Sequence, residues 1–198
     1  MNIESIIQNE LPKLQGWCSV EKGLRMAELC RNAELCVELG VFGGRGLVAM
    51  ALPLAAQNSG QAHGIDPFTA SAAVDGTNDQ ANSEWWRGID FEEIARGAQE
   101  ALDRLGLSNH ARLIRMNSSE VAACYEDGSI DVLHQDSNHS EEVSCQEVAL
   151  WHSKIRAGGY WIADDTNCTS TQKAQRELVA FGFVELEDHA TWKVYRRP

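Results

Sequence analysis

The sequence has no excess of basic residues, no long apolar run and no closely spaced cysteine pair. Its 198 residues hold 17 Lys and Arg against 29 Asp and Glu, which gives a net charge of -12. A chain with this balance has little to neutralise a nucleic-acid backbone or an anionic lipid surface. No apolar stretch approaches the length of a transmembrane helix. We therefore expect a small-molecule partner, and neither nucleic acid nor membrane.

The six cysteines include no CxxC pair, the spacing typical of zinc and redox sites. Most of them lie within apolar segments of the sequence. This pattern favours reduced core cysteines in a cytoplasmic protein over disulfides or a zinc site. The N-terminal segment also lacks a basic stretch followed by an apolar core, so we expect no signal peptide.

The alternation of apolar segments predicts an α/β fold formed by a single domain over residues 1–198. Two short helices are expected within 1–33, and the tail alternates like an antiparallel hairpin. Buried strands are expected at 35–41, 62–66, 111–116, 129–136 and 158–165, with helices between them. This order predicts a doubly wound, mostly parallel sheet with helices on both faces. In such sheets, ligands bind at the carboxyl ends of the strands.

Segment 67–90 departs from this regular alternation, because it is long, polar and carries Trp85 and Trp86 near its end. A loop of this length in a compact domain is usually functional or disordered. We expect a lid or substrate loop, whose tryptophans either stack on a ligand or latch the segment onto the core. Four further histidines are expected in loops or on solvated faces and receive no role: His63, His110, His152 and His189.

A glycine-rich stretch with Gly40, Gly43 and Gly44 follows the first strand and opens a helix. A nucleotide-type cofactor loop has this setting. The spacing is not GxGxxG, because Phe42 takes the second glycine position. That disfavours a dinucleotide, whose pyrophosphate needs close approach of the backbone, and favours S-adenosylmethionine, which has no pyrophosphate. Asp66 at the end of the second strand can accept hydrogen bonds from ribose hydroxyls. For the loop alone, a plain strand-to-helix turn is the alternative.

Three aspartates, Asp136, Asp164 and Asp165, end two strands that we expect to be neighbours about 5 Å apart. Their carboxylates would repel one another unless a positive charge neutralised them. A hard divalent cation suits oxygen ligands, so Mg2+ is expected, with Ca2+ or Mn2+ as substitutes. The structural alternative is that these residues only cap turns and helices, with Asn138 as the N-cap of the helix that follows.

Taken in order, these motifs resemble class I S-adenosylmethionine-dependent methyltransferases. The resemblance rests on Glu38 to Gly44, Gly64 to Phe68, Ile130 to Asp136 with His139, Gly158-Gly159, and Asp164-Asp165. The most similar branch is that of Methyltransf_24 and the macrocin O-methyltransferases. The resemblance spans residues 35–198 and implies a Rossmann-like, seven-stranded sheet that ends in an antiparallel hairpin.

The resemblance also implies roles for individual residues. The implied metal ligands are Asp136, Asp164 and Asp165, and the implied catalytic residues are His139, as general base, and Asp136. Many relatives carry an acid where Ser118 stands, which sets this chain apart at the adenine contact. The implied cofactor residues are Glu38, Gly40, Phe42, Gly43, Gly44, Asp66, Ser118, Ser119, His134 and Asp136.

The expected activity is therefore O-methylation, with S-adenosylmethionine and a divalent metal, of a hydroxyl on a sugar or similar natural product. Two other classes stay open. One is an NAD-type oxidoreductase on the same fold, against which the missing GxGxxG counts. The other is a non-catalytic methyltransferase-fold protein that only binds the cofactor or a partner. A homodimer is compatible with all three.

Overall fold

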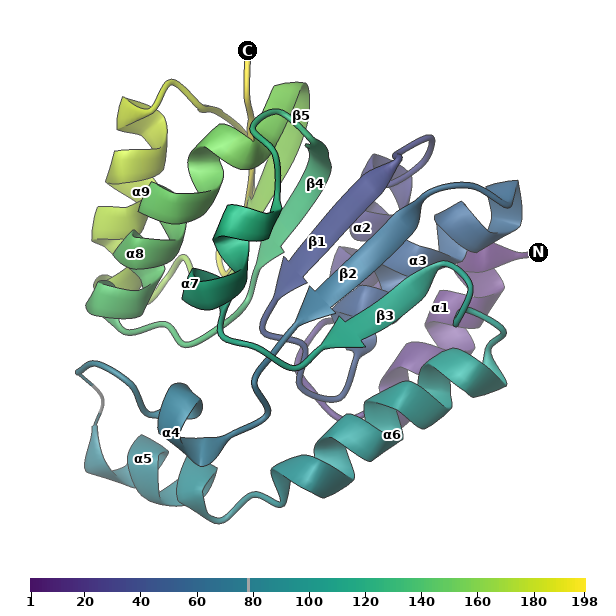
Figure 1. The fold of residues 1–198 in the computed structure, drawn as a ribbon, viewed down its shortest axis with the longest axis horizontal. Helices are drawn as coiled ribbons and strands as arrows, with labels where there is room; N and C mark the ends of the chain where they lie inside the picture. Colours follow the sequence, from purple (N-terminus) through teal and green to yellow (C-terminus); the bar gives the residue numbers. More distant parts are fainter. Residues whose placement is uncertain (78) are drawn as a thin grey trace.

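The computed structural model describes residues 1–77 and 79–198 and has a seven-stranded sheet at its centre (Figure 1). The strands are β1 (Leu35–Leu39), β2 (Gln61–Ile65), β3 (Ala111–Ile114), β4 (Ile130–Gln135), β5 (Ile155–Ala163), β6 (Val184–Asp188) and β7 (Lys193–Arg196). Their order across the sheet is β3-β2-β1-β4-β5-β7-β6. Strands β1 to β5 pair in parallel, whereas β7 pairs antiparallel with both β5 and β6. The predicted fold class is confirmed.

Strand β5 begins at Ile155, three residues before the expected start at 158. Ile155 pairs with Ile130, and the register then shifts before Val132 pairs with Tyr160. Gly158 lies inside this irregularity with a φ of 76°. A glycine with positive φ lets a strand bulge and continue. The Gly158-Gly159 pair therefore marks a bulge within the strand and not its beginning.

Helices cover both faces of the sheet (Figure 1). One face carries α1 (Ile3–Glu10), α2 (Val20–Leu29), α3 (Arg45–Gln57) and α6 (Phe91–Arg104). The other carries α7 (Ser118–Val121), α8 (Glu141–Trp151) and α9 (Gln172–Ala180). Short 3-10 turns occur at Leu11–Lys13, Ala122–Cys124, His152–Lys154 and Thr169–Thr171. Each face has its own apolar core, with Leu47 and Met50 in the first and Trp151 and Trp161 in the second.

Helix α2 turns one side towards α3, and that side includes a lysine. Ser19 is the N-cap, and its hydroxyl accepts a hydrogen bond from the Lys22 amide at 3.1 Å. The buried side of the helix consists of Lys22, Gly23, Met26 and Ala27. The spacing of these positions is that of an apolar helix face. Lys22 thus lies where the sequence pattern calls for an apolar residue.

The expected loop at 67–90 contains two short helices, α4 (Ala70–Ala73) and α5 (Gln80–Arg87), so the expectation of an irregular loop was wrong. Residue 78 of this segment lies outside the described residues. The N-caps account for the helices, because the side chains of Thr69 and Asp79 each accept a hydrogen bond from a first-turn amide. Both helices lie beyond the carboxyl ends of β1 and β2 (Figure 1).

Cys18, Cys30 and Cys36 are buried, as expected of core cysteines, whereas Cys124 is exposed and Cys145 and Cys168 are half-buried. Among the helices of the described residues, none combines the length and apolarity needed to cross a bilayer.

His63 lies in β2 and is buried, so its expected place in a loop or on a solvated face was wrong. Arg112 donates to Nε2 at 2.8 Å, and Nδ1 lies 2.8 Å from the hydroxyl of Tyr125. Because Nε2 accepts, the neutral ring carries its proton on Nδ1. Burial and the neighbouring Arg112 charge lower the pKa of His63 to about 4.

A pH-dependent stability follows from His63. In the unfolded chain the pKa of His63 is about 6.5. As the pH falls from there towards about 4, the unfolded state binds a proton more readily than the folded state, and this favours unfolding. Replacement by glutamine (His63→Gln) removes this titration. We expect the wild type to lose about 2 kcal/mol more unfolding free energy than the variant between about pH 7 and about pH 4.5. Denaturant unfolding at both pH values measures the difference, and equal losses would contradict the assignment.

Candidate functional site

A cavity of about 680 Å³ opens at the carboxyl ends of the strands. Its wall combines the glycine loop after β1, Asp66 after β2, Ser118 and Ser119 after β3, and the aspartates after β4 and β5. This size is typical of sites for small organic ligands. Most of the predicted site residues therefore gather around one cavity, as the topology of the sheet requires, whereas Gly43, Gly44 and His134 do not line it.

The glycine loop between β1 and α3 is shaped by left-handed backbone conformations. Gly40, Phe42 and Gly44 have φ values of 82°, 46° and 87°. A Cβ on Gly40 would lie 2.2 Å from the carbonyl oxygen of Asp136, and one on Gly43 would lie 2.3 Å from that of Gln15. Glycine is therefore required at both positions, whereas Phe42 carries a side chain at a costly φ.

Asp66 braces this loop. Its Oδ2 accepts hydrogen bonds from the amides of Val41 and Phe42 at 2.9 and 3.0 Å, and its Oδ1 accepts one from Phe68 at 2.7 Å. Each carboxylate oxygen has two acceptor sites, so capacity for a ligand hydroxyl is left. The contact with a ribose stays a prediction, but the carboxylate has a structural task that the sequence did not reveal.

The hydroxyl of Ser118 is engaged beside the cavity, where it donates to Glu147 at 2.7 Å. Glu147 is buried and also accepts from Ser137 and Gln135, at 2.7 and 3.0 Å. Burial raises the pKa of Glu147. Sequence reasoning did not single out Glu147, which fixes two cavity-lining serines. Ser119 also lines the cavity.

Beneath the cavity, Glu38 of β1 and His134 of β4 form a buried pair. They are register partners in adjacent strands, and Oε1 lies 2.8 Å from Nδ1. Among the described residues, the second oxygen of Glu38 and Nε2 of His134 have no hydrogen-bond partner. Burial raises the pKa of Glu38. Buried polar atoms without partners favour a place for a ligand.

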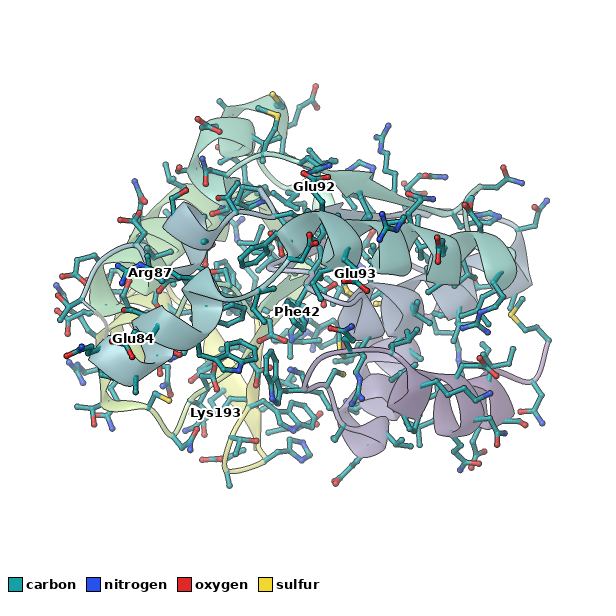
Figure 2. All side chains as sticks on the ribbon, turned by 90° about the horizontal axis from the view of Figure 1, so that it is seen from below. Phe42, Glu84, Arg87, Glu92, Glu93 and Lys193 are labelled. Carbon is teal, nitrogen blue, oxygen red and sulfur yellow. The ribbon has the colours of Figure 1, made fainter. Side chains whose placement is uncertain are left out.

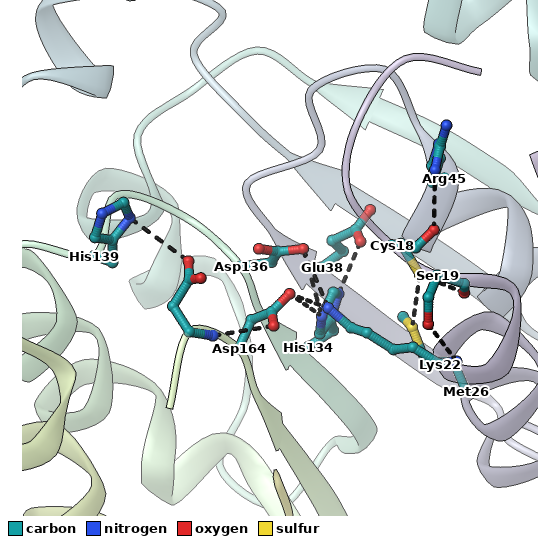
Figure 3. Close-up of polar contacts among 11 residues, drawn as sticks. Cys18, Ser19, Lys22, Met26, Glu38, Arg45, His134, Asp136, His139 and Asp164 are labelled. Atoms are coloured by element: carbon teal, nitrogen blue, oxygen red, sulfur yellow. Dashed lines mark hydrogen bonds and ion pairs between the residues drawn. The ribbon is translucent and has the colours of Figure 1, made fainter. Parts of the chain in front are cut away.

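Lys22 of α2 reaches into the acidic rim and was missed in the sequence. Its ammonium forms an ion pair with Asp164 and lies 3.4 Å from Oδ2 of Asp136 (Figure 3). Nε2 of His134 lies 3.7 and 3.8 Å from the same two carboxylate oxygens. The available signal was a lysine on the apolar side of an amphipathic helix, in a chain whose strand ends are acidic.

The protonation states follow from this packing. Burial alone would lower the pKa of Lys22, but Asp136 and Asp164 raise it above its ordinary value. Burial and the Asp164 charge raise the pKa of Asp136 to about 8, although Lys22 opposes them. Burial also acts to raise the pKa of Asp164, but His134 and Lys22 lower it overall. Lys22 is therefore a cation held by a carboxylate.

Asp165 and His139 form a separate contact on the outer side of the rim. Asp165 Oδ2 lies 3.6 Å from Nδ1 of His139, and both side chains are about two-fifths exposed, at 42% and 39%. Asp165 has a φ of 50°, the left-handed region that aspartate tolerates. Burial and the charge of Asp164 raise the pKa of Asp165. His139 thus faces the cavity with a carboxylate behind it.

The three aspartates meet at one rim, but they do not enclose a common space for a metal ion. Two of them turn to Lys22, and Asp165 turns to His139. A different set, Glu38, His134 and Asp136, offers ligand atoms within 4.8 Å of one another. In the arrangement observed, the predicted ligand set does not fit a divalent cation unless Lys22 leaves.

The alternative that the polar residues after β4 only cap a helix can be checked at Asn138. Ser140 is the N-cap of α8, so the expectation that Asn138 takes this position was wrong. The Asn138 side chain instead donates to the carbonyl oxygens of Ala72 and Asp75, at 3.0 and 2.8 Å. It thereby ties the end of β4 to α4.

Aromatic rings cover one side of the cavity. Trp17 stacks on Phe42 with ring centroids 5.2 Å apart, and Trp85 and Trp86 meet Trp17 edge-on. Trp86 also stacks on Phe91 at the start of α6. Phe42 lies between α5 and α6 (Figure 2). The two tryptophans of α5 line the cavity while they pack on the loop and the N-terminal segment.

Comparison with known proteins places this site in a family. The model of one family, described as a methyltransferase domain, matches residues 37–166. That span includes the glycine loop, both acidic strand ends and His139. No curated protein matches the chain in sequence.

Solved structures of similar fold include several methyltransferases. An S-adenosylmethionine-dependent O-methyltransferase from Thermotoga maritima is 11% identical, with a TM-score of 0.66 over 100% of this chain and 71% of that one. The O-methyltransferase NovP is 15% identical, with a TM-score of 0.72 over 90% and 80%. TomG from Streptomyces achromogenes, solved with its cofactor, is 13% identical, with a TM-score of 0.61 over 99% and 88%. At these identities the likeness is one of fold.

The close contact at Gly40 leads to a stability prediction. The variant Gly40→Ala places a Cβ against the Asp136 carbonyl at a positive φ, so we expect it to lose about 2 kcal/mol or more. Gly97 in α6 is the matched control, because a Cβ there meets nothing within 4 Å. Gly97→Ala should gain about 0.5–1 kcal/mol. Thermal unfolding of both variants tests the contrast, and equal effects would refute it.

Proposed function

The chain belongs to the methyltransferase domain family, and on that premise we propose that it transfers the methyl group of S-adenosylmethionine to a hydroxyl of a small molecule. One observation carries this proposal. A single cavity joins a glycine loop, an acid after the second strand, and an acidic rim with a histidine. The O-methyltransferases of similar fold support the choice of cofactor and of oxygen as the acceptor.

The cofactor suits the inner part of the cavity. Glu38 has a buried carboxylate oxygen without a partner among the described residues, and a ligand ammonium would satisfy it. Gly40 lines the cavity where the loop backbone packs closely on that of Asp136. Asp66 keeps acceptor capacity for a ribose hydroxyl, and we assign Ser118 and Ser119, which line the same cavity, to the adenine edge.

When bound, the cofactor supplies a methyl group on a positively charged sulfur. The acceptor oxygen bonds to the methyl carbon, the carbon–sulfur bond breaks with its electron pair on sulfur, and the acceptor proton passes to the protein. His139 is the residue we assign to that proton, because it faces the cavity with Asp165 behind it. Imidazole is the side chain best suited to take a proton near neutral pH.

Divalent-metal assistance, which the sequence favours, is the second candidate. The observation on its side is the cluster of Glu38, His134 and Asp136, whose ligand atoms lie within 4.8 Å of one another. The observation against a metal is that the Lys22 ammonium already pairs with both Asp136 and Asp164. A metal at the predicted triad would have to displace this ammonium. A sugar or similar polyol as acceptor is also part of the proposal, on the strength of the resemblance alone.

Cofactor binding is the first test. Isothermal titration with S-adenosylhomocysteine should give saturable binding to the wild type. Asp66→Ala removes two hydrogen bonds to the glycine loop and one to Phe68, so we expect at least roughly tenfold weaker binding. The control Glu100→Ala alters an exposed acid on α6 and should bind like the wild type. No binding to the wild type at millimolar cofactor would refute the proposal.

His139 is tested by turnover. With labelled S-adenosylmethionine and a library of sugars and phenols, any acceptor found should be methylated at least roughly a hundredfold more slowly by His139→Ala. Cofactor affinity should stay unchanged, because only the proton acceptor is lost. The control is His110→Ala, because His110 lies in the turn just before β3. Undiminished turnover in His139→Ala would exclude it as the base, and cofactor binding without turnover on any acceptor would favour a binding protein.

A further inference from the structure

The position of Lys22 is fixed by helix α2, which carries it and packs closely on its neighbours. The Ser19 cap starts α2 three residues before it, and the neighbouring Gly23 packs against Leu11 and Ala49. A Cβ on Gly23 would lie 2.5 Å from the Leu11 side chain, so α2 sits close on its neighbours. Only 3% of Lys22 is exposed. The side chain is thus directed inward by the same packing that fixes α2.

The surroundings of its ammonium are strongly acidic. Asp136 and Asp164 contact it directly, and His134 connects this pair to the buried Glu38 below. Buried carboxylates without a counter-charge are costly, and removal of one partner of such a pair destabilises a protein strongly. The rim therefore needs a cation, and the chain itself provides one. Among the described residues, Lys22 is the lysine that pairs with these two aspartates, and His134 lies 3.7 and 3.8 Å from the same oxygens.

An ammonium and a divalent ion act differently on an acceptor. A metal binds the acceptor oxygen through its lone pair, whereas an ammonium donates a hydrogen bond to it. Lysine has three donors, and the two aspartates take two of them. Lys22 also lines the cavity, so one donor is left for a ligand bound there.

We propose that Lys22 is the resident cation of this site: it pairs with Asp136 and Asp164 and positions the acceptor oxygen, so that methyl transfer needs no divalent metal. The proposal rests on the proposed function for the reaction, but its central claim concerns the cation site alone. It assigns Lys22 as a positioning residue that keeps a metal out. Loss of Lys22 should therefore open the acidic rim to a divalent ion.

Titration with Mn2+, followed by electron paramagnetic resonance, tests this on protein loaded with S-adenosylhomocysteine and on protein without it. The wild type and Lys22→Arg, which keeps the charge, should show no saturable binding up to millimolar Mn2+. Lys22→Met should bind Mn2+ at least roughly tenfold more tightly, because the ammonium no longer occupies the place between Asp136 and Asp164. Lys154→Met is the matched control, since Lys154 forms an ion pair with Asp127 away from the cavity.

Each outcome decides the proposal. Saturable Mn2+ binding to the wild type at the rim, abolished by Asp164→Asn, overturns it, and so does a folded Lys22→Met that gains no affinity. If Lys22→Met fails to fold, the wild-type titration decides: no binding supports the proposal and tight binding overturns it. Failure of S-adenosylhomocysteine to bind would refute the proposed function while leaving the Mn2+ result on Lys22 intact.

Discussion

The parallel register of β1, β4 and β5 determines which side chains share the rim of this sheet. Glu38 pairs with His134 across β1 and β4, and the next pairing, Gln135 with Ala163, brings Asp136 beside Asp164. A slip of one residue would turn every one of these side chains to the opposite face. The close contact between Gly40 and the Asp136 backbone depends on the same register. The cofactor loop, the buried pair and the acidic rim are therefore consequences of one alignment.

That alignment concentrates acidic side chains at the rim, and helix α2 supplies a basic side chain that pairs with them. Helix α2 packs on α3 through a buried side that carries Lys22 to the rim. Together with Trp17, which stacks on Phe42, this makes the N-terminal segment part of the site although it lies outside the matched span of the family. The outer pair of His139 and Asp165 is left apart from this network and open to the cavity.

Much of this arrangement could be predicted from the sequence, because apolar periodicity and strand-end residues are local signals. They indicated the alternation of strands and helices, the C-terminal hairpin, the glycine loop and the convergence of Asp136 and Asp164, but not the full order of the strands across the sheet. Lys22 could not be predicted in the same way, since its partners are more than a hundred residues away and the pattern marks its position as apolar. The hydrogen bonds that Asp66 makes to the loop after β1, and the burial of His63 against Arg112 and Tyr125, were missed because they depend on contacts between separate elements. The helices of 67–90 were missed although Thr69 and Asp79 were readable caps.

We propose that a lysine of the chain, and not a metal ion, is the cation at the rim of a cofactor site. The decisive measurement is a crystal structure with S-adenosylhomocysteine, grown with Mn2+ and recorded at the manganese absorption edge. We expect the cofactor product along the loop from Gly40 to Gly44, the Lys22 ammonium between Asp136 and Asp164, and no anomalous peak there. An anomalous peak bound by Asp136 and Asp164, with Lys22 turned away, would contradict it.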